Sequence, residues 1–305
     1  MKKKKLILVD TNNQLYIVLF SRYLFTKYEG LKFDEVDKSA TESLFRDSLK
    51  MMMQKYFNIL EYNSEYDVSL LYAKDSKRLW RRKRIFKEYK SQRKGVRSKS
   101  TVDFKLVYYI FDKIWDKLKE TLPHRFVETE NAEVDDIIYR TIIKEYDNFD
   151  EFEIISTDGD FVQLMKFPKV RIYNPKKYEY VKMSDPKFEL FEKIIRGDKS
   201  DNIPNIFSNS RQHRQPPIKT DKINNWYKNY DTLFKDFISN ESKTVKENFI
   251  RNKKLIDMSL LPEDIGKEID VEISKPATEY DMQKIIRLSK DYFLDFVMEK
   301  LEFIP

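Results

Sequence analysis

Short apolar runs alternate with amphipathic segments along the first 185 residues of the chain. Each run ends at polar or acidic positions, which is typical of parallel strands buried on both faces. The predicted strands are residues 6–9, 68–72, 153–156 and 170–173. Between them, apolar residues at helical spacing predict helices over residues 43–60 and 103–119 and a third that Asn131 caps and that runs to about Tyr146. The alternation predicts an α/β fold with a mainly parallel central sheet flanked by helices.

The pattern changes near residue 186, beyond which the apolar spacing is helical and shows no clear strand. We therefore predict an α/β domain over residues 1–185 and a mostly helical domain, including a duplex-binding region, over residues 186–305. Residues 208–219 have two adjacent prolines and no apolar period, which predicts a long loop. No run of about 18 apolar residues is present, and the run behind Lys2–Lys5 is too short for a signal peptide, so we expect a soluble protein without a membrane partner.

Composition excludes several classes of chemistry. The chain has no Cys, which excludes disulfides, thiolate zinc sites and a Cys nucleophile. With His124 and His213 as its two histidines, a His-rich metal site or a Ser-His-Asp triad is not expected. The five glycines cannot be assembled into a glycine-rich phosphate loop. The groups left for chemistry are carboxylates, Lys, Arg and Tyr.

Positive charge is concentrated in one segment. Residues 77–99 hold twelve basic residues and one acid, a net charge of +11, whereas the whole chain carries +7 and the other 282 residues therefore sum to −4. Such a segment fits a polyanion such as the phosphate backbone of nucleic acid, although a solvated charge run is the simpler alternative. The aromatic residues among these cations favour base stacking: Trp80, Phe86 and Tyr89. We therefore expect this segment to contact nucleic acid.

Carboxylates gather where the predicted strands end. Asp10 follows the first strand, and Asp158 and Asp160 follow the third, so parallel pairing would bring them to one edge of the sheet. Three acids begin the preceding helix and two more follow an apolar helix near residue 195: Glu133, Asp135, Asp136, Asp198 and Asp201. Taken singly, these groups have the ordinary explanation of acids at helix starts and in turns.

Together, the eight carboxylates have a different meaning. In one cleft they would repel one another and would not ionise unless cations held them. Without Cys and with almost no His, those cations would be Mg²⁺, or Mn²⁺ in its place. Two such ions about 4 Å apart can clamp the attacking and leaving oxygens of a phosphodiester. With a basic segment nearby, the acidic cluster predicts metal-dependent phosphodiester cleavage.

Five motifs resemble one family. In chain order they are ILVDTNN at 7–13, YKSQR at 89–93, EVDD at 133–136, STDGD at 156–160 and GDKSDNI at 197–203. Over about the first 205 residues, their order and spacing resemble the FEN-type 5′-nuclease superfamily of flap endonucleases and 5′→3′ exonucleases. The likeness is strongest to the T-even phage ribonuclease H branch, through LWRRKR at 79–84, QLMKFPKV at 163–170 and IIRGDKSDN at 194–202.

The resemblance implies two metal ions and a basic helical arch over residues 77–100. The first ion or its shell would take Asp10, Glu133, Asp135, Asp158 and Asp160, and the second Asp198 and Asp201, with Asp136 close by. Lys90, Arg93 and Arg81 match catalytic cations of the arch, of which the first two contact the scissile phosphate. Tyr16 or Tyr89 would stack an end base, although Tyr16 fits a core position equally well. The other nucleic-acid contacts of the arch would be Arg82, Lys83, Arg84, Lys87, Lys94 and Arg97.

Two positions depart from the family pattern. The family's acid after the second strand falls on Ala73, with Asp75 displaced by two residues, so either the loop presents Asp75 as a further ligand or that carboxylate is missing. The glycine-rich helix–hairpin–helix that usually follows the last motif is absent, since no Gly occurs between Asn202 and Gly266. Residues 204–222 instead resemble the phage variant, with a longer loop ahead of a helix at Lys222.

The resemblance implies a Mg²⁺-dependent 5′→3′ exonuclease and flap endonuclease. It would act on RNA·DNA and DNA·DNA duplexes and remove RNA primers during phage-type DNA replication, as a monomer in the cytoplasm of an infected bacterial host. Its partners would be branched or nicked duplex DNA and RNA·DNA hybrid, with a single-stranded-DNA-binding protein and a sliding clamp as candidate protein partners. Two alternatives stay open: a PIN-like endonuclease for single-stranded RNA, against which the arch argues, and a non-catalytic DNA-junction-binding protein, which Ala73 prompts.

Overall fold

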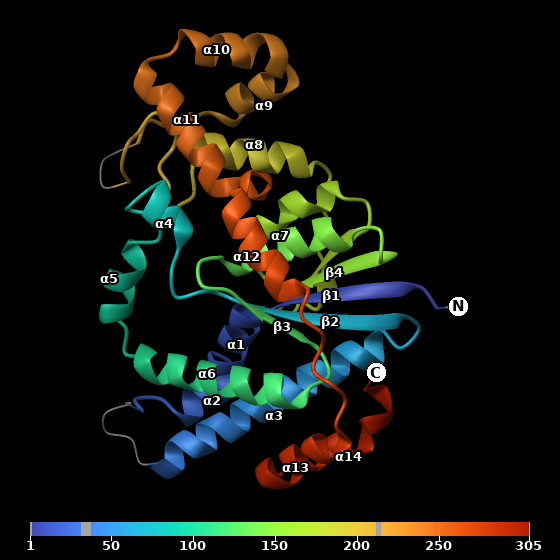
Figure 1. The fold of residues 1–305 in the computed structure, drawn as a ribbon. Helices are drawn as coiled ribbons and strands as arrows, with labels where there is room; N and C mark the ends of the chain where they lie inside the picture. Colours follow the sequence, from blue (N-terminus) through green and yellow to red (C-terminus); the bar gives the residue numbers. More distant parts are fainter. Residues whose placement is uncertain (1, 32–37, 212–214, 305) are drawn as a thin grey trace.

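A six-stranded sheet forms the centre of the protein (Figure 1). The computed structural model describes residues 2–31, 38–211 and 215–304. The strand order is β3-β2-β1-β4-β5-β6, and all neighbours pair in parallel except β5 and β6. The predicted α/β class with a mainly parallel sheet is therefore confirmed. The strands are β1 Lys4–Asp10, β2 Asp67–Lys74, β3 Arg125–Glu128, β4 Glu151–Ile155, β5 Val170–Asn174 and β6 Glu179–Tyr180.

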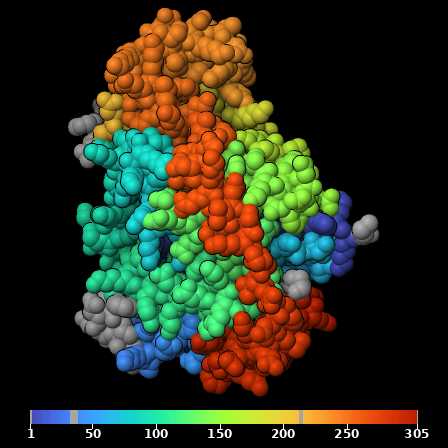
Figure 2. Space-filling model, in the orientation of Figure 1, coloured from blue at the N-terminus to red at the C-terminus, as the bar shows by residue number. Residues whose placement is uncertain are grey.

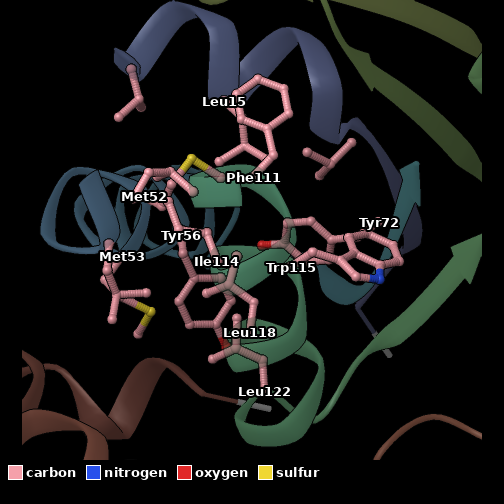
Figure 3. Packing of buried hydrophobic residues seen from close by; sticks show 14 of the residues in the cluster. Leu15, Met52, Met53, Tyr56, Tyr72, Phe111, Ile114, Trp115, Leu118 and Leu122 are labelled. Carbon is pink, nitrogen blue, oxygen red and sulfur yellow. The ribbon is translucent and has the colours of Figure 1, made fainter. Parts of the chain in front are cut away.

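Both faces of the sheet are covered, and β1 shows the consequence for the sequence. Successive side chains of a strand point to opposite faces. Leu6 and Leu8 join a core with helices α7 (Val134–Glu145) and α12 (Glu263–Ile273), whereas Ile7 and Val9 join the core on the other face. That second core, part of which is shown in Figure 3, is formed with α1 (Thr11–Leu19), α3 (Lys38–Tyr62) and α6 (Phe104–Thr121). A strand between two cores must be apolar at successive positions, which explains the continuous run.

Several element bounds differ from the predicted ones, and local capping explains two of the differences. Helix α6 begins at Phe104 because the Asp103 side chain accepts hydrogen bonds from the first-turn backbone. The prediction that Asn131 caps α7 is wrong: Glu133 is its N-cap and forms a capping box with Asp136. Helix α3 is longer than predicted, and the short helix α2 (Arg22–Lys27) was not predicted. Strands β3 and β6 were not predicted either, because β3 mixes charged and apolar residues and β6 has two residues.

Beyond β6 the described chain is helical. Helices α8 (Pro186–Arg196), α9 (Thr220–Lys228), α10 (Lys235–Asn240) and α11 (Lys243–Ile256) surround an apolar cluster that includes Phe191, Trp226 and Phe234. The chain then returns to the sheet, where α12 packs with α7, and α13 (Met282–Tyr292) and α14 (Phe296–Glu299) join the core around α3. In Figure 2 the orange part of the chain, which includes α11 and α12, lies against its cyan and green parts. The domain boundary at residue 185 stays a prediction.

Two sequence predictions concern segments outside the regular elements. Residues 208–211 and 215–219 form neither helix nor strand, which agrees with the predicted loop, and His213 lies outside the described residues. Within the described ranges, every helix is too short or too polar to cross a bilayer.

His124 is buried between α6 and β3 and makes the stability of the fold depend on pH. Its Nε2 lies 2.9 Å from the Tyr56 hydroxyl, and burial lowers its pKa from 6.5 to about 3. The unfolded chain therefore takes up a proton as the pH falls below 6.5, whereas the folded protein does so only near pH 3. The free energy of unfolding should consequently decrease as the pH falls through this window, by up to ~1.4 kcal/mol per pH unit.

Urea denaturation at pH 7 and pH 5 tests this prediction. The variant His124→Gln should lose part of the difference in unfolding free energy that the wild type shows between the two pH values, because Gln does not titrate. If both proteins lost the same stability on acidification, His124 would not be the group responsible.

Candidate active site

Two neighbouring strands end in acids. β1 and β4 pair in parallel, so their carboxyl ends lie at the same edge of the sheet. Asp10 Oδ1 accepts a hydrogen bond from Asn13 N (3.0 Å), and Asp10 Oδ2 accepts one from Ser156 Oγ (2.8 Å). Asp158 follows Ser156 by two residues, and its Oδ1 accepts a hydrogen bond from Asp160 N (2.9 Å). The structure thus brings Asp10, Asp158 and Asp160 to one edge, which we call the acidic edge.

Asp75 reaches the same edge from β2. Asp10 pairs with Ala73 across the sheet, and Ala73 is fully buried. Asp75 lies just beyond the strand, where its N–H donates to Asn12 Oδ1 (2.9 Å) and its Oδ1 accepts from Val134 N (2.9 Å). These contacts place it between the first turns of α1 and α7. The loop after β2 therefore presents a carboxylate at the acidic edge, although the resemblance implied that the family's acid falls on Ala73.

The first turn of α7 contributes three acids with different surroundings. Glu133 is buried and accepts hydrogen bonds from Lys90 Nζ (2.5 Å) and Arg81 NH1 (2.8 Å). Asp136 is completely buried and faces Arg81 as well. Among the described residues, no group hydrogen bonds to the Asp135 carboxylate, which interacts through space with Asp158 and Asp160. Of the three, Asp135 is thus the one with its oxygens free toward the acidic edge.

Helix α8 and the loop after it supply the last two acids. Gly197 ends the helix, and backbone hydrogen bonds between Asp198 and Ile203 in both directions (2.9 and 2.7 Å) close the loop. Lys193, about one helical turn before Gly197, forms ion pairs with Asp160 and with Asp198 (2.6 Å for the second). It therefore links the acids after β4 to the acids after α8. Lys193 was not among the predicted site residues, although it is a lysine near the end of the helix that leads into the GDKSDNI motif.

Burial and mutual repulsion raise the pKa of most of these carboxyl groups. At Asp10 burial is the largest cause and raises the pKa to about 7, with the nearby charges of Asp75 and Asp158 adding to it. Glu133 is the opposite case: burial alone would raise its pKa, but Lys90 and Arg81 outweigh burial and lower the pKa to about 2. Acids with a raised pKa and little pairing attract additional positive charge. Burial is also the leading cause of the raised pKa at Asp75, Asp135, Asp160 and Asp201.

Protein cations lie among these acids. Lys90 Nζ lies 3.6 Å from Asp201 as well as close to Glu133, and Arg93 NH2 lies 2.9 Å from Asp201. In the part of the chain that the structure describes, no three acidic or histidine side chains are grouped closely enough to hold a metal ion as they stand. The available donors are carboxylates, which suit Mg²⁺ or Mn²⁺. The acids outnumber the basic side chains that contact them. The carboxylates therefore fit a metal centre with oxygen ligands, provided that the basic side chains move aside.

The basic segment, which we call the strap (residues 77–100), crosses the acidic edge as two short helices, α4 (Trp80–Arg84) and α5 (Gln92–Ser98). It is fastened to the loop after α8 by hydrogen bonds from Asn202 Nδ2 to Glu88 O (2.8 Å) and from Lys90 N to Asp201 O (2.9 Å). Lys90 and Asn202 have positive φ angles, 54° and 60°, which residues other than glycine rarely adopt. These hydrogen bonds and backbone angles constrain both the strap and the loop after α8 at the point where Lys90 contacts Asp201.

Some expectations for the strap are wrong. Trp80 and Tyr89 are 3% and 2% exposed, so they cannot stack on bases. Phe86 is partly buried and its ring lies beside the Arg251 guanidinium. Tyr16 is partly buried and packs edge-on against Phe111, which is the core position that was its alternative. The burial of these aromatic side chains leaves the strap with cations as its means of contacting nucleic acid.

Apart from Lys90 and Arg93, the strap cations that were predicted to act in the site or on nucleic acid fall into two groups. Lys83, Lys87 and Lys94 are exposed. The others have partners within the protein: Arg81 binds Glu133 and Asp136, Arg82 donates to Tyr89 O, Arg84 pairs with Asp264, and Arg97 lies over the rings of Phe104 and Tyr108. The net charge of the segment therefore overstates the number of cations that are available to a ligand without rearrangement.

Comparison with known proteins identifies the family. Residues 5–193 match the family described as 5′-3′ exonuclease, N-terminal resolvase-like domain. The chain is 28% identical over 238 residues to the ribonuclease H of Enterobacteria phage T4, a match that covers 73% of this chain and 76% of the relative. It is 29% identical over 212 residues to the 5′-3′ exonuclease of Buchnera aphidicola subsp. Schizaphis graminum (strain Sg), covering 67% and 66% of the two chains.

A solved structure shares the fold. It is the flap endonuclease of bacteriophage T5 in a pseudo-enzyme–product complex with DNA and metal ions, and it matches with a TM-score of 0.56 and 17% identity over 98% of this chain and 99% of that one. Because the family match spans more than half of the chain, and because the acidic edge offers carboxylates beside cations, the protein belongs to the 5′-3′ exonuclease family and is a nuclease.

Proposed function

We propose that the protein is a Mg²⁺-dependent 5′→3′ exonuclease and flap endonuclease that acts on RNA·DNA and DNA·DNA duplexes. One observation supports this proposal above all: acids lie close to the two strap cations Lys90 and Arg93. These acids come from the ends of β1, β2 and β4, from α7 and from the loop after α8. A phosphodiester placed between the strap and the acidic edge would have cations on one side and metal-binding oxygens on the other. Removal of RNA primers during phage-type replication follows as the biological role, and the name of the T4 relative supports it.

The metal ions would be held by carboxylates. Asp10, Asp135, Asp158 and Asp160 would hold the first ion, with Glu133 and Asp75 beside them, and Asp198 and Asp201 would hold the second. When bound, two Mg²⁺ ions supply a nucleophilic hydroxide and stabilise the leaving oxygen, and Mn²⁺ can take their place. The solved relative that contains metal ions supports a divalent-metal requirement.

Lys90 and Arg93 would bind and orient the scissile phosphate. In the structure they neutralise Glu133 and Asp201. With Glu133 and Asp201 neutralised by bound cations instead, the Lys90 and Arg93 side chains would be free to turn toward the phosphate while they stay on the strap. Preorganised cations that face the developing negative charge stabilise the transition state. Lys193, paired with Asp160 and Asp198, would be displaced in the same way by the second ion.

The exposed cations of the strap would hold the duplex or flap outside the site. Lys83, Lys87 and Lys94 are exposed, so they can contact phosphates without breaking an internal ion pair. We further propose that the protein works as a monomer in the cytoplasm of an infected bacterial host. A single-stranded-DNA-binding protein and a sliding clamp are the proposed protein partners.

Titration with Mg²⁺ tests the proposed function. We expect a 5′-flap DNA and an RNA·DNA hybrid of the same sequence to be cut from the 5′ side, with a rate that rises with Mg²⁺ and vanishes in EDTA. Cleavage of single-stranded RNA alone would favour the PIN-like alternative. Binding of flap DNA without cleavage at any Mg²⁺ or Mn²⁺ concentration would favour the junction-binding alternative, which Ala73 prompts and against which Asp75 at the acidic edge argues.

A further inference from the structure

Both carboxylate oxygens of Asp136 accept hydrogen bonds from buried groups of the protein. Its Oδ1 accepts a hydrogen bond from Arg81 NH2 (2.7 Å). Its Oδ2 accepts three, from Trp80 Nε1 (2.8 Å), Arg81 NH1 (2.9 Å) and Glu133 N (3.1 Å). The residue is completely buried. A carboxylate offers about four acceptor positions, and Asp136 receives four hydrogen bonds from the protein, three on Oδ2 and one on Oδ1. With the side chain buried, neither oxygen is exposed to a metal ion at the acidic edge.

Arg81 is occupied to the same extent. Besides the two-pronged contact with Asp136, its NH1 donates to Glu133 Oε2 (2.8 Å) and its Nε donates to Leu255 O (3.1 Å). Its side chain is 4% exposed. Every nitrogen of the guanidinium therefore has a protein acceptor. The side chain could reach a phosphate at the acidic edge only by breaking its hydrogen bonds to Asp136, which would leave a buried carboxylate without its partner.

The two residues join elements that carry the proposed chemistry. Arg81 lies in α4, at the base of the strap, and Asp136 lies in the first turn of α7. Glu133 accepts from Arg81 with Oε2 and from Lys90 with Oε1. Arg81 thus binds one oxygen of Glu133 and Lys90 binds the other, so Glu133 links α4 to the part of the strap that carries Lys90.

We infer that Asp136 is a positioning residue and not a metal ligand, and that Arg81 acts through Asp136 and Glu133 and not on the substrate. This inference rests on the proposed function, whose metal ligands it narrows. Asp136 binds the Arg81 guanidinium, and Arg81, which lies in α4 of the strap, also binds Glu133. Glu133 in turn binds Lys90. The same pattern, in which an outer residue orients a group that acts, recurs around metal centres.

A double-mutant cycle tests the inference, with Arg81→Met, Asp136→Asn and the double variant. The first readout is the binding of Mn²⁺ alone, measured by calorimetry, with Asp135→Asn as the matched control one residue away on the same turn. Asp136→Asn should bind Mn²⁺ with the stoichiometry and affinity of the wild type, whereas Asp135→Asn should lose a site or bind about tenfold more weakly. Loss of Mn²⁺ binding in Asp136→Asn to the same extent as in Asp135→Asn would overturn the inference.

The second readout is cleavage of a 5′-flap DNA. Each single variant should lower kcat by about 10- to 100-fold with little change in KM. The double variant should be no slower than the slower single variant, because the two residues act as one unit. Arg81→Lys should not restore kcat, since an ammonium group cannot make the two-pronged contact. Effects of the two single variants that multiply in the double variant would contradict a shared role.

Two controls keep the outcomes separate. The first control, circular dichroism with thermal unfolding, shows whether a variant folds. The second is the apolar double variant Arg81→Met/Asp136→Leu, which removes both charges together. It is used if a single change leaves an unpaired buried charge that unfolds the chain. This double variant should fold and bind Mn²⁺ while remaining slow; wild-type speed would overturn the inference. If Asp135→Asn and Asp158→Asn both bind Mn²⁺ like the wild type, the proposed metal cluster fails, whereas non-additive kcat values would still establish the pairing of Arg81 with Asp136.

Discussion

Asp158→Asn is expected to lower the rate of flap cleavage by about a thousandfold or more while leaving substrate binding intact, because metal ions supply several kcal/mol of transition-state stabilisation. Asp158 lies at the acidic edge near Asp10, whose pKa its charge helps to raise. The amide keeps an oxygen that can accept the hydrogen bond from Asp160 N, so the turn after β4 should keep its shape. The substitution therefore removes one negative charge and little else.

Single-turnover cleavage and a separate binding measurement, each across a range of Mg²⁺, check this result. Asp281→Asn is the matched control, since Asp281 also caps a helix through its side chain but belongs to α13, away from the acidic edge. The control should cut like the wild type. An Asp158→Asn enzyme that cuts as fast as the wild type would refute the metal mechanism, and one that fails to bind flap DNA would instead indicate damage to the fold.

Gly197→Ala should have the largest effect on stability of any glycine substitution in this chain. Gly197 has φ 70° and ψ −173°, a region that is essentially restricted to glycine and costs other residues about 1–3 kcal/mol. A Cβ atom there would lie 2.3 Å from Ile203 O and 2.4 Å from Pro204 O. Both carbonyls are backbone atoms that cannot move freely, because Ile203 O accepts from Asp198 N and Pro204 O accepts from Asn252 Nδ2.

We expect this variant to lose several kcal/mol of unfolding free energy in urea, or to fold with the loop after α8 displaced. Displacement would separate Asp198 and Asp201 from the strap and abolish cleavage. Gly95→Ala is the matched control, because no atom lies within 4 Å of its added Cβ and Gly95 lies within a helix; its stability should equal or slightly exceed that of the wild type. Equal stability of Gly197→Ala and the wild type would show that the loop tolerates the strain.

The sequence predicted the sheet well because its strands are buried on both faces. The run Leu6–Val9 has no polar interruption, and such a run is hard to place anywhere except between two layers. Strand β3 carries no such signal, since its residues are half charged and its burial is incomplete. The start of α7 was misplaced because Asn131 is the more usual cap residue, whereas here Glu133 accepts the bond through a capping box.

Most residues of the candidate site could be predicted from the sequence, but the contacts among them could not. Asp10 and Asp158 could be placed at one edge, because parallel strands fix which ends meet. Nothing local indicates that Trp80 and Tyr89 are buried, since the strap reads as a solvated basic segment; their burial depends on α7, α8 and α11, which lie far along the chain. For the same reason, Arg81 could be identified as a cation but not as the partner of Asp136.

The contact between Arg81 and Leu255 joins residues that are synthesised far apart in time. The Leu255 carbonyl accepts from Arg81 Nε, and the Leu255 side chain packs with Tyr89 of the strap and with Ile203 of the loop after α8. A ribosome makes this residue 174 positions after Arg81, long after the last acid of the site has emerged. Chains fold as they are synthesised, N-terminal parts first. A nascent chain that has not completed α11 therefore carries every candidate metal ligand but lacks the hydrogen bond between Arg81 and Leu255. The nuclease should consequently stay inactive on the ribosome until α11 has been made.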